Sequence, residues 1–383
     1  MKGLRACFLS LAFCVGLVPI SAAEQHGLLL SETEIELLLS HGPWPEAATV
    51  DPSNRVSGSR EAIALGRHLF FDPGLSVTGT VSCATCHQPE RGWTDGLARG
   101  KGIGLVDRNT QSLLNVGRNR WFGWAGSSDS LWAHSTVPLI DPKEMGATPA
   151  HVTQRMAGDP VLSRHYSSVF GSPPDPADAE ATLVNAAKAL AAFQETLVGD
   201  RTAFDDFRDA LARGDRAAAS QFPADAQRGA QLFVGRGKCN VCHVGPHFSN
   251  GEFSDVAVPY FVEPGRVDPG RYAGIAKLKA SPFNRLGPYS DDAGRASAWA
   301  TVHVVQLHSN FGEFKVPSLR NLTQTAPYMH NGSKATLEDV IRHYSELNME
   351  RLHVDGERIL EPLLLSTDEA GALLAFLKSL SPR

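Results

Sequence analysis

Two short stretches decide the fold of this chain: Cys83-Ala84-Thr85-Cys86-His87 and Cys239-Asn240-Val241-Cys242-His243. Each places two cysteines at the spacing of the c-type haem attachment motif and follows them directly with histidine. Two thiols at this spacing can both bond to the vinyl groups of one haem, and the next residue is then held beneath the iron as its proximal ligand. A structural zinc site, a redox disulfide and a pair of disulfides are the alternatives, but none of them explains a histidine after both pairs. We therefore expect two covalently bound haem c groups.

The residues around the two motifs also repeat. Leu65-Gly66-Arg67-His68-Leu69-Phe70 precedes the first motif and Arg228-Gly229-Ala230-Gln231-Leu232-Phe233 the second. Gly92-Trp93-Thr94-Asp95-Gly96 follows the first histidine, much as Phe248-Ser249-Asn250-Gly251 follows the second. Equivalent cysteines are separated by 239 − 83 = 156 residues. The repetition predicts a mainly α protein of two cytochrome-c-like haem domains from an internal duplication, with long loops.

The two haem domains are expected over residues 24–220 and 221–383. Capping and periodicity predict helices from Ser31 through Leu39, over 181–197 and over 368–380, the last capped by Thr367. The last helix could also pack back on the first domain. Glycine- and proline-rich loops are predicted over 88–130 and 244–295, and loops of this length usually wrap something, here the haem edges.

The first 23 residues have the pattern of a secretory signal peptide. A mostly apolar run from Ala6 to Ile20 ends in Ser21-Ala22-Ala23, which is small where a signal peptidase cleaves. The run is shorter than the roughly 20 apolar residues of a bilayer crossing. A lipid anchor on Cys14 is the alternative. We expect an exported, periplasmic chain without a membrane span, in agreement with haem attachment outside the bacterial cytoplasm.

Composition excludes disordered and collagen-like architectures and argues against a nucleic-acid-binding protein. The chain has 383 residues, 42% apolar and 20% charged, as globular proteins do. The formal charge is 36 − 41 = −5, so no basic surface is available for a polyanion. Nucleic acid is therefore not an expected partner.

One helix carries a further candidate ligand. Thr336 and Asp339 form a capping box, and Leu337, Val340, Ile341 and Tyr344 then share one face. Tyr344 is thus directed inward. It is either a core tyrosine whose hydroxyl finds a polar partner or the second axial ligand of the second haem.

Taken together, these residues resemble the bacterial di-haem cytochrome c peroxidase and MauG family. Beside the haem motifs, the resemblance rests on Leu69-Phe70-Phe71-Asp72-Pro73, Asp129-Ser130-Leu131-Trp132, Pro138 with Glu144-Met145-Gly146, Phe314-Lys315-Val316-Pro317-Ser318-Leu319-Arg320-Asn321 and Thr325-Ala326-Pro327-Tyr328-Met329-His330-Asn331-Gly332. Within the family, the MbnH-like di-haem enzymes are the most similar, through Asp129–Trp132, Gly270-Arg271-Tyr272-Ala273-Gly274-Ile275 and Leu286-Gly287-Pro288-Tyr289-Ser290-Asp291.

The resemblance implies a role for individual residues. His87 and His243 match the proximal ligands, and Trp124 matches the tryptophan between the haems. Glu144 matches the distal carboxylate of the peroxide-binding haem, and Tyr344 falls where the peroxidases place an axial methionine and MauG a tyrosine. Calcium between the domains is implied by the positions of Asn109, Thr325 and Pro327.

The chain also departs from the family pattern. His134 replaces a common glutamine and is a candidate acid–base group, weak haem ligand or neutral hydrogen-bond donor. No histidine lies between Gln88 and Gln111, where reductively activated peroxidases carry a blocking ligand, so the first haem is expected to be open. Gly237 stands where MauG has its exit tryptophan. The alternative exit candidates are Trp93, Trp121, Trp132 and Trp299.

The resemblance implies a periplasmic oxidase that uses hydrogen peroxide to reach a high-valent bis-ferryl state and then oxidises a side chain of a partner protein. By similarity to the MbnH-like enzymes, the reaction would convert tryptophan to kynurenine on an MbnP-like copper-associated protein. The alternatives are a cytochrome c peroxidase supplied by small redox proteins and a di-haem electron carrier or redox sensor. Tyr344 argues against the peroxidase, because a phenolate stabilises ferric iron, and Glu144 with an open haem argues against the carrier.

Overall fold

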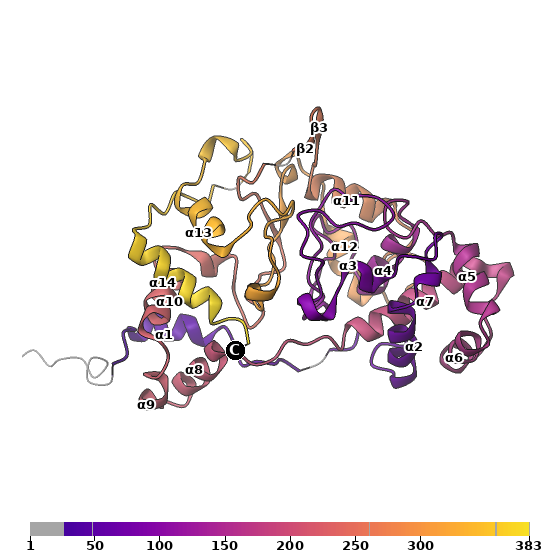
Figure 1. Cartoon of the computed structure of the whole chain (residues 1–383), viewed down its shortest axis with the longest axis horizontal. Helices are drawn as coiled ribbons and strands as arrows, with labels where there is room; N and C mark the ends of the chain where they lie inside the picture. Colours follow the sequence, from indigo (N-terminus) through magenta and orange to yellow (C-terminus); the bar gives the residue numbers. More distant parts are fainter. Residues whose placement is uncertain (1–26, 48, 260, 357, 383) are drawn as a thin grey trace, which may run out of the picture.

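The computed structural model describes residues 27–47, 49–259, 261–356 and 358–382. The predicted signal peptide lies outside this part of the chain. The described residues form two mainly helical lobes that lie side by side (Figure 1). None of the described helices has the length and apolar character of a bilayer span.

Each lobe has its own hydrophobic core and its own haem motif. The first lobe contains α2 (Arg60–Phe70), α3 (Cys83–Cys86), α4 (Leu131–Ile140), α5 (Pro149–Gly158), α6 (Pro160–Phe170), α7 (Ala179–Gln194), α11 (Arg271–Ala280) and α12 (Trp299–His303). The second contains α1 (Glu32–Leu39), α8 (Ala203–Ala212), α9 (Arg216–Ala219), α10 (Ala224–Val234), α13 (Leu337–Ser345) and α14 (Thr367–Lys378). Two short antiparallel pairs join β1 (Phe253–Ser254) to β4 (Phe314–Lys315) and β2 (Phe261–Glu263) to β3 (Arg266–Val267).

The two cores do not follow the order of the chain. Helix α1 and the helices between 203 and 222 pack in the core of the second motif. In return, the segment 271–301 crosses to the first lobe, where Arg271 donates to the carbonyl of Gly126 at 2.8 Å and Thr301 donates to Asp129 at 2.7 Å. The packing therefore differs from a division at residue 220. Segments before this residue contribute to the core of the second motif, and a segment after it contributes to the core of the first.

Equivalent helix pairs form the two cores. Helix α2 crosses α7 at Gly66, where a Cβ would lie 1.9 Å from the carbonyl oxygen of Ala189. Helix α10 crosses α14 at Gly229, where a Cβ would lie 2.0 Å from the carbonyl oxygen of Ala372. These glycines occupy the same place in the two repeated sequences. The last helix thus packs on α10 in the second lobe, where its Phe376 also meets Phe204 with ring centroids 5.7 Å apart.

We expect Gly229→Ala to destabilise the protein by about 2 kcal/mol, or several degrees in Tm, because the new methyl group overlaps a backbone oxygen that cannot rotate away. Thermal unfolding of the holoprotein measures the change. Gly371→Ala is the matched control, since Gly371 lies on α14 with no atom within 4 Å of the added Cβ. That substitution should be neutral or stabilising through higher helix propensity. Equal effects of the two substitutions would contradict the close-packing argument.

Several predicted boundaries need correction. The helix predicted over 181–197 spans Ala179–Gln194, because Asp178 caps it earlier. The last helix is capped by Ser366 in a capping box with Glu369, one residue before the predicted cap. The stretch 244–295, predicted as loop, contains α11. The N-cap of this helix is Gly270, and glycine is required there because φ is 59° and a Cβ would lie 2.3 Å from the carbonyl oxygen of Glu313.

Candidate functional site

The histidines of the two motifs are held in the same way. His87 Nδ1 lies 3.0 Å from the carbonyl oxygen of Trp93, and His243 Nδ1 lies 3.0 Å from that of Phe248. Because a carbonyl only accepts, each Nδ1 carries the proton, which leaves Nε2 for a metal. Both acceptor residues have positive φ, 62° at Trp93 and 53° at Phe248, a conformation that bulky residues rarely adopt. The backbone is thus bent at equivalent places to aim a carbonyl at each ring.

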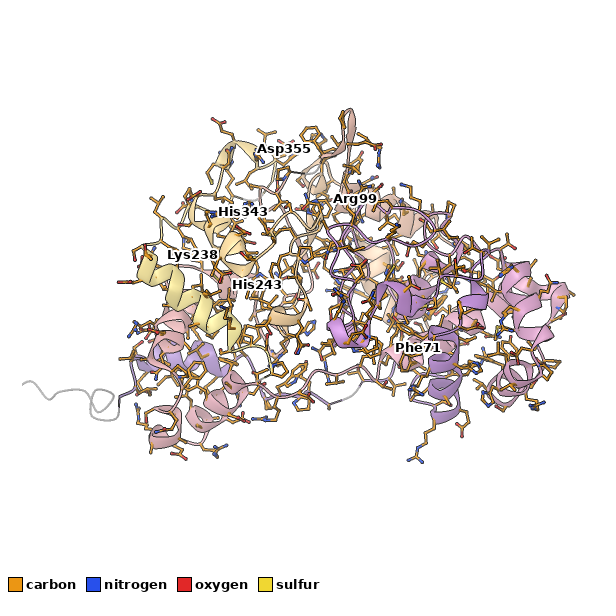
Figure 2. The ribbon with its side chains drawn as sticks, viewed as in Figure 1. Phe71, Arg99, Lys238, His243, His343 and Asp355 are labelled. Atoms are coloured by element: carbon orange, nitrogen blue, oxygen red, sulfur yellow. The ribbon has the colours of Figure 1, made fainter. Side chains whose placement is uncertain are left out.

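A cavity of about 360 Å³ opens beside the second motif. Cys239, Cys242 and His243 line it, and so does the face of helix α13 predicted from periodicity: Leu337, Val340, Ile341 and Tyr344. Both thiols of this motif are free of disulfides. Two thiols that form no disulfide, an imidazole with Nε2 available and an apolar wall are the groups that covalent haem attachment requires, so the residues fit a haem. Figure 2 shows His243 in the interior of the second lobe.

Tyr344 faces this cavity from the last turn of α13. The capping box of Thr336 and Asp339 fixes the start of the helix and therefore the direction of the tyrosine. Burial, together with the two nearby thiols of Cys239 and Cys242, raises the pKa of its phenol. No hydrogen bond joins the hydroxyl to another described residue. The side chain is only partly enclosed by protein atoms, and its hydroxyl does not have the polar partner that a core tyrosine ordinarily finds.

Glu144 lies near the thiols of the first motif. Burial, assisted by Asp141, raises the pKa of this carboxyl to about 7. The loop predicted to be free of a blocking histidine packs against it, since Ile103 N donates to the carbonyl of Glu144 at 3.0 Å and Gly104 N to that of Lys143 at 2.7 Å. Glycine is required at Gly102, where a Cβ would lie 2.6 Å from the carbonyl oxygen of Glu144. The loop thereby fixes the backbone of the carboxylate.

His134 lies on α4, near His87 of the first motif. Burial, with Lys315 and His87 as lesser causes, lowers its pKa to about 4, so the ring is neutral at pH 7. Its Nδ1 is buried without a hydrogen-bond partner among the described residues. Phe122 stacks on the ring with centroids 6.3 Å apart. A neutral imidazole agrees with the expected role of a neutral hydrogen-bond donor. Its Nδ1 still needs a hydrogen-bond partner.

Trp124 lies on the wall of the cavity. Its Nε1 donates to the carbonyl of Asn109 at 2.9 Å, and its own carbonyl accepts from Lys315 N at 2.8 Å. Asn109, Thr325 and Pro327 line the same cavity. No described residue donates a hydrogen bond to Asn109 Oδ1 or to the Thr325 and Pro327 carbonyls, and the calcium site expected at these positions stays a prediction.

Three further buried groups were not found from the sequence. Lys315 is buried on β4, burial lowers its pKa to about 8, and its Nζ lies 3.4 Å from the carbonyl of Trp121. His247 lines the cavity with an unpartnered Nδ1, and burial lowers its pKa to about 3. His41 reaches the carbonyl of His243 at 3.1 Å from 202 residues away. No local pattern marks these residues, although Lys315 lies within a quoted motif.

The tryptophan candidates for electron exit differ in exposure. Trp132 and Trp121 are buried, Trp93 is half-buried, and Trp299 is 64% exposed on α12. The position that corresponds to the MauG exit tryptophan has no room for a side chain, because a Cβ on Gly237 would lie 2.6 Å from the carbonyl oxygen of Leu232. Trp299 is therefore the surface candidate.

Two haem attachment motifs with equivalent, backbone-oriented histidines define the class of the protein as a di-haem c-type cytochrome. The family model "Di-haem cytochrome c peroxidase" matches residues 60–213. The chain is 35% identical to the methylamine utilization protein MauG of Methylorubrum extorquens, over 91% of this chain and 86% of that protein. It is 29% identical to the cytochrome c551 peroxidase of Nitrosomonas europaea, over 92% and 90%.

Solved structures agree. A MauG-like protein associated with microbial copper homeostasis superposes with a TM-score of 0.67 at 26% identity, over 89% of this chain and 96% of that one. The di-haem peroxidase BthA of Burkholderia thailandensis shares the fold, with a TM-score of 0.68 at 21% identity over 89% of each chain. The chain belongs to the di-haem cytochrome c peroxidase/MauG family and is a di-haem oxidoreductase of the peroxidase and oxidase type.

Proposed function

We propose that this protein is a hydrogen-peroxide-dependent oxidase that removes electrons from a side chain of a partner protein. The observation that carries the proposal is Tyr344, whose phenol lines the same cavity as Cys239, Cys242 and His243. A phenolate ligand is hard and anionic and favours oxidised iron, whereas a thioether favours the ferrous state. A second haem held in this way would retain an oxidising equivalent and would be a poor entry point for electrons.

In this proposal Cys83, Cys86, Cys239 and Cys242 would attach the two haems, His87 and His243 would each bind one iron, and Tyr344 would be a further ligand of the second. When bound, the haems supply iron redox chemistry and one open coordination position. Burial disfavours the free phenolate of Tyr344, so its deprotonation depends on the charge of the metal. Trp124, which lines the same cavity, is the proposed π-system for sharing charge between the haems.

Glu144 is the proposed proton carrier. Its carboxylate takes a proton from one oxygen of hydrogen peroxide and returns it to the other, so that water leaves. A carboxyl with a pKa of about 7 exists in both forms at neutral pH, as this exchange requires. His134, neutral and with one free ring nitrogen, orients the peroxide by hydrogen bonding.

This role predicts a pH dependence. Below pH 7 Glu144 is mostly protonated and cannot accept the first proton, so the rate constant for the reaction with peroxide should rise about tenfold per pH unit and level off above pH 7. Stopped-flow spectroscopy of the holoprotein between pH 5 and 9 measures the profile. The Glu144→Gln variant should lack the inflection, and a flat wild-type profile would contradict the assignment.

We also propose that Asn109 Oδ1 and the carbonyls of Thr325 and Pro327 bind calcium. The neighbouring hydrogen bond from Trp124 to Asn109 ties this ion to the segment between the haems. Removal of calcium with EGTA should lower Tm by several degrees, and Ca²⁺ but not Mg²⁺ should restore it. In Asn109→Ala the chelator should have little further effect. A Tm that does not respond to EGTA in the wild type would argue against the site.

The proposed partner is an MbnP-like copper-associated protein in the periplasm, and the proposed reaction converts tryptophan to kynurenine. The similarity in fold and sequence to a MauG-like protein associated with microbial copper homeostasis supports this choice. The stoichiometry balances with two hydrogen peroxide molecules: two oxygen atoms enter the indole to give N-formylkynurenine and two waters, and hydrolysis then releases formate. Trp299 is the proposed exit point because it is exposed beside Val302 and other apolar side chains.

Mass spectrometry of candidate partners, incubated with the holoprotein and peroxide, tests the proposal. Kynurenine formation is a loss of one carbon and gain of one oxygen on a tryptophan, and it should depend on enzyme and peroxide together. Trp299→Ala should slow partner modification without slowing the first reaction with peroxide. An unmodified partner and rapid turnover with reduced cytochrome c or a cupredoxin would indicate the peroxidase instead. An enzyme inert to peroxide would indicate an electron carrier.

A further inference from the structure

A cluster of possible metal ligands lies on the surface, apart from the haem motifs. His308, His353 and Asp355 each offer a ligand atom, and these atoms all lie within 4.8 Å of one another. Among the described residues, no other group of three histidine, cysteine or carboxylate side chains meets this condition. Figure 2 shows Asp355 at the outer edge of the molecule, away from His243. The cluster is therefore separate from the site assigned above.

Two different segments supply the cluster. His308 begins the short 3-10 turn His308–Asn310, next to α11, and the other two residues lie in the loop after Leu352. The rings of His308 and His353 stand edge to face with centroids 4.8 Å apart. His308 Nδ1 lies 3.0 Å from Asp355 Oδ2. Three side chains from segments some 45 residues apart in sequence thus already converge.

The backbone on both sides of the cluster is anchored. Asn310 Oδ1 accepts from Leu307 N at 2.8 Å and closes the first turn. Asp255 Oδ2 accepts from His353 N at 2.8 Å, and Leu352 packs beside Ala257. The ligand side chains themselves stay accessible, with His308 72% and Asp355 58% exposed. An anchored backbone reduces the ordering cost of binding, while exposure lets an ion enter from solvent.

The ligand set selects a class of ion. Imidazole nitrogens suit Cu²⁺, Zn²⁺ and Ni²⁺, whereas Ca²⁺ and Mg²⁺ prefer oxygen ligands alone. Two nitrogens and one carboxylate leave further positions for water or for a side chain of another molecule. Copper binds most tightly to sites of this kind in the divalent series. We propose that His308, His353 and Asp355 form a surface site for a divalent transition-metal ion, with Cu²⁺ preferred over Zn²⁺. This inference does not depend on the proposed oxidase function.

Isothermal titration of the holoprotein with Zn²⁺, in buffer that contains Ca²⁺, is the primary test. The wild type should bind one equivalent, and the double variant His308→Ala/His353→Ala should bind at least about 100-fold more weakly. Asp355→Asn, which retains shape but loses charge, should weaken binding by about tenfold. With Cu²⁺, electron paramagnetic resonance should show coupling to two nitrogens. If the chain is cleaved after Ala23, His26 and the free amino terminus form another Cu²⁺ ligand set, so the copper experiment uses a His26→Ala background.

The chain provides a matched control in a second histidine pair. His68 and His165 are exposed on the first lobe with ring centroids 6.3 Å apart, and they are not part of a three-ligand group. His68→Ala/His165→Ala should leave Zn²⁺ affinity unchanged. Both double variants change exposed side chains, and circular dichroism with Tm confirms that they fold. Absence of stoichiometric binding in the wild type, or equal binding by the wild type and His308→Ala/His353→Ala, would overturn the proposal.

Discussion

Glu144→Gln should lower the rate constant for the reaction of the diferric holoprotein with hydrogen peroxide by about 10²- to 10⁴-fold, the range that a positioned general acid–base group contributes. The amide keeps the size of the side chain but cannot accept a proton. Stopped-flow absorbance at the haem bands measures the loss. Haem content and the resting spectrum should not change, because Glu144 is not a haem attachment residue.

Glu195→Gln is the matched control for this experiment. Burial also raises the pKa of Glu195 to about 7, but its carboxylate accepts a hydrogen bond from Ser57 at 2.7 Å. Glu144 contributes to the raised pKa of the Cys83 and Cys86 thiols, whereas Glu195 does not. Its substitution should leave the reaction with peroxide unchanged. If both variants lost activity equally, loss of a buried charge and not proton transfer at the first haem would be the cause.

Tyr344→Met should convert the protein from an oxidase to a peroxidase. A thioether in place of the phenol should raise the reduction potential of the second haem by a few hundred millivolts, within the span of about 0.8 V that axial ligands cover. The variant should no longer retain oxidising equivalents after stoichiometric peroxide, and it should gain turnover with reduced cytochrome c. Optical redox titration and Mössbauer spectroscopy of the two forms measure these changes.

Tyr328→Phe is the control for the phenol. Tyr328 lines the same cavity, but its hydroxyl already donates to the carbonyl of Leu322 at 2.7 Å. Removal of this hydroxyl should not change the reduction potential of the second haem. Unchanged potentials in Tyr344→Met would mean that Tyr344 is a neighbour and not a ligand.

The sequence predicts most of the local chemistry of the site. The attachment motifs, the repeated segments and the capping box before Tyr344 are each written in adjacent residues, so spacing alone is enough to find them. The inward direction of Tyr344 follows from helical periodicity and agrees with its place in the cavity. The family resemblance placed Glu144, Trp124 and the candidate calcium ligands, whose roles stay predictions until they are tested.

Other features depend on contacts that no local pattern encodes. His41 reaches the carbonyl of His243 only because α1 packs in the second core. The positive φ of Trp93 and Phe248 was not expected, since neither residue type favours it. The division of the chain near residue 220 followed the order of the repeats, whereas apolar burial pairs segments far apart in sequence. The surface cluster of His308, His353 and Asp355 was missed because no motif joins its members.

The exchange of segments between the lobes bears on how the chain folds. The first core is not complete until Phe283 and Tyr289 pack against it and Lys188 pairs with Asp291 at 2.6 Å. These contacts span about a hundred residues or more, and such high contact order slows folding. A chain that emerges from its amino end therefore cannot complete the first core until about three quarters of it has been exported. We expect Cys83 and Cys86 to stay accessible to haem until that point, so the late completion of the first core leaves time for the cofactor to be attached.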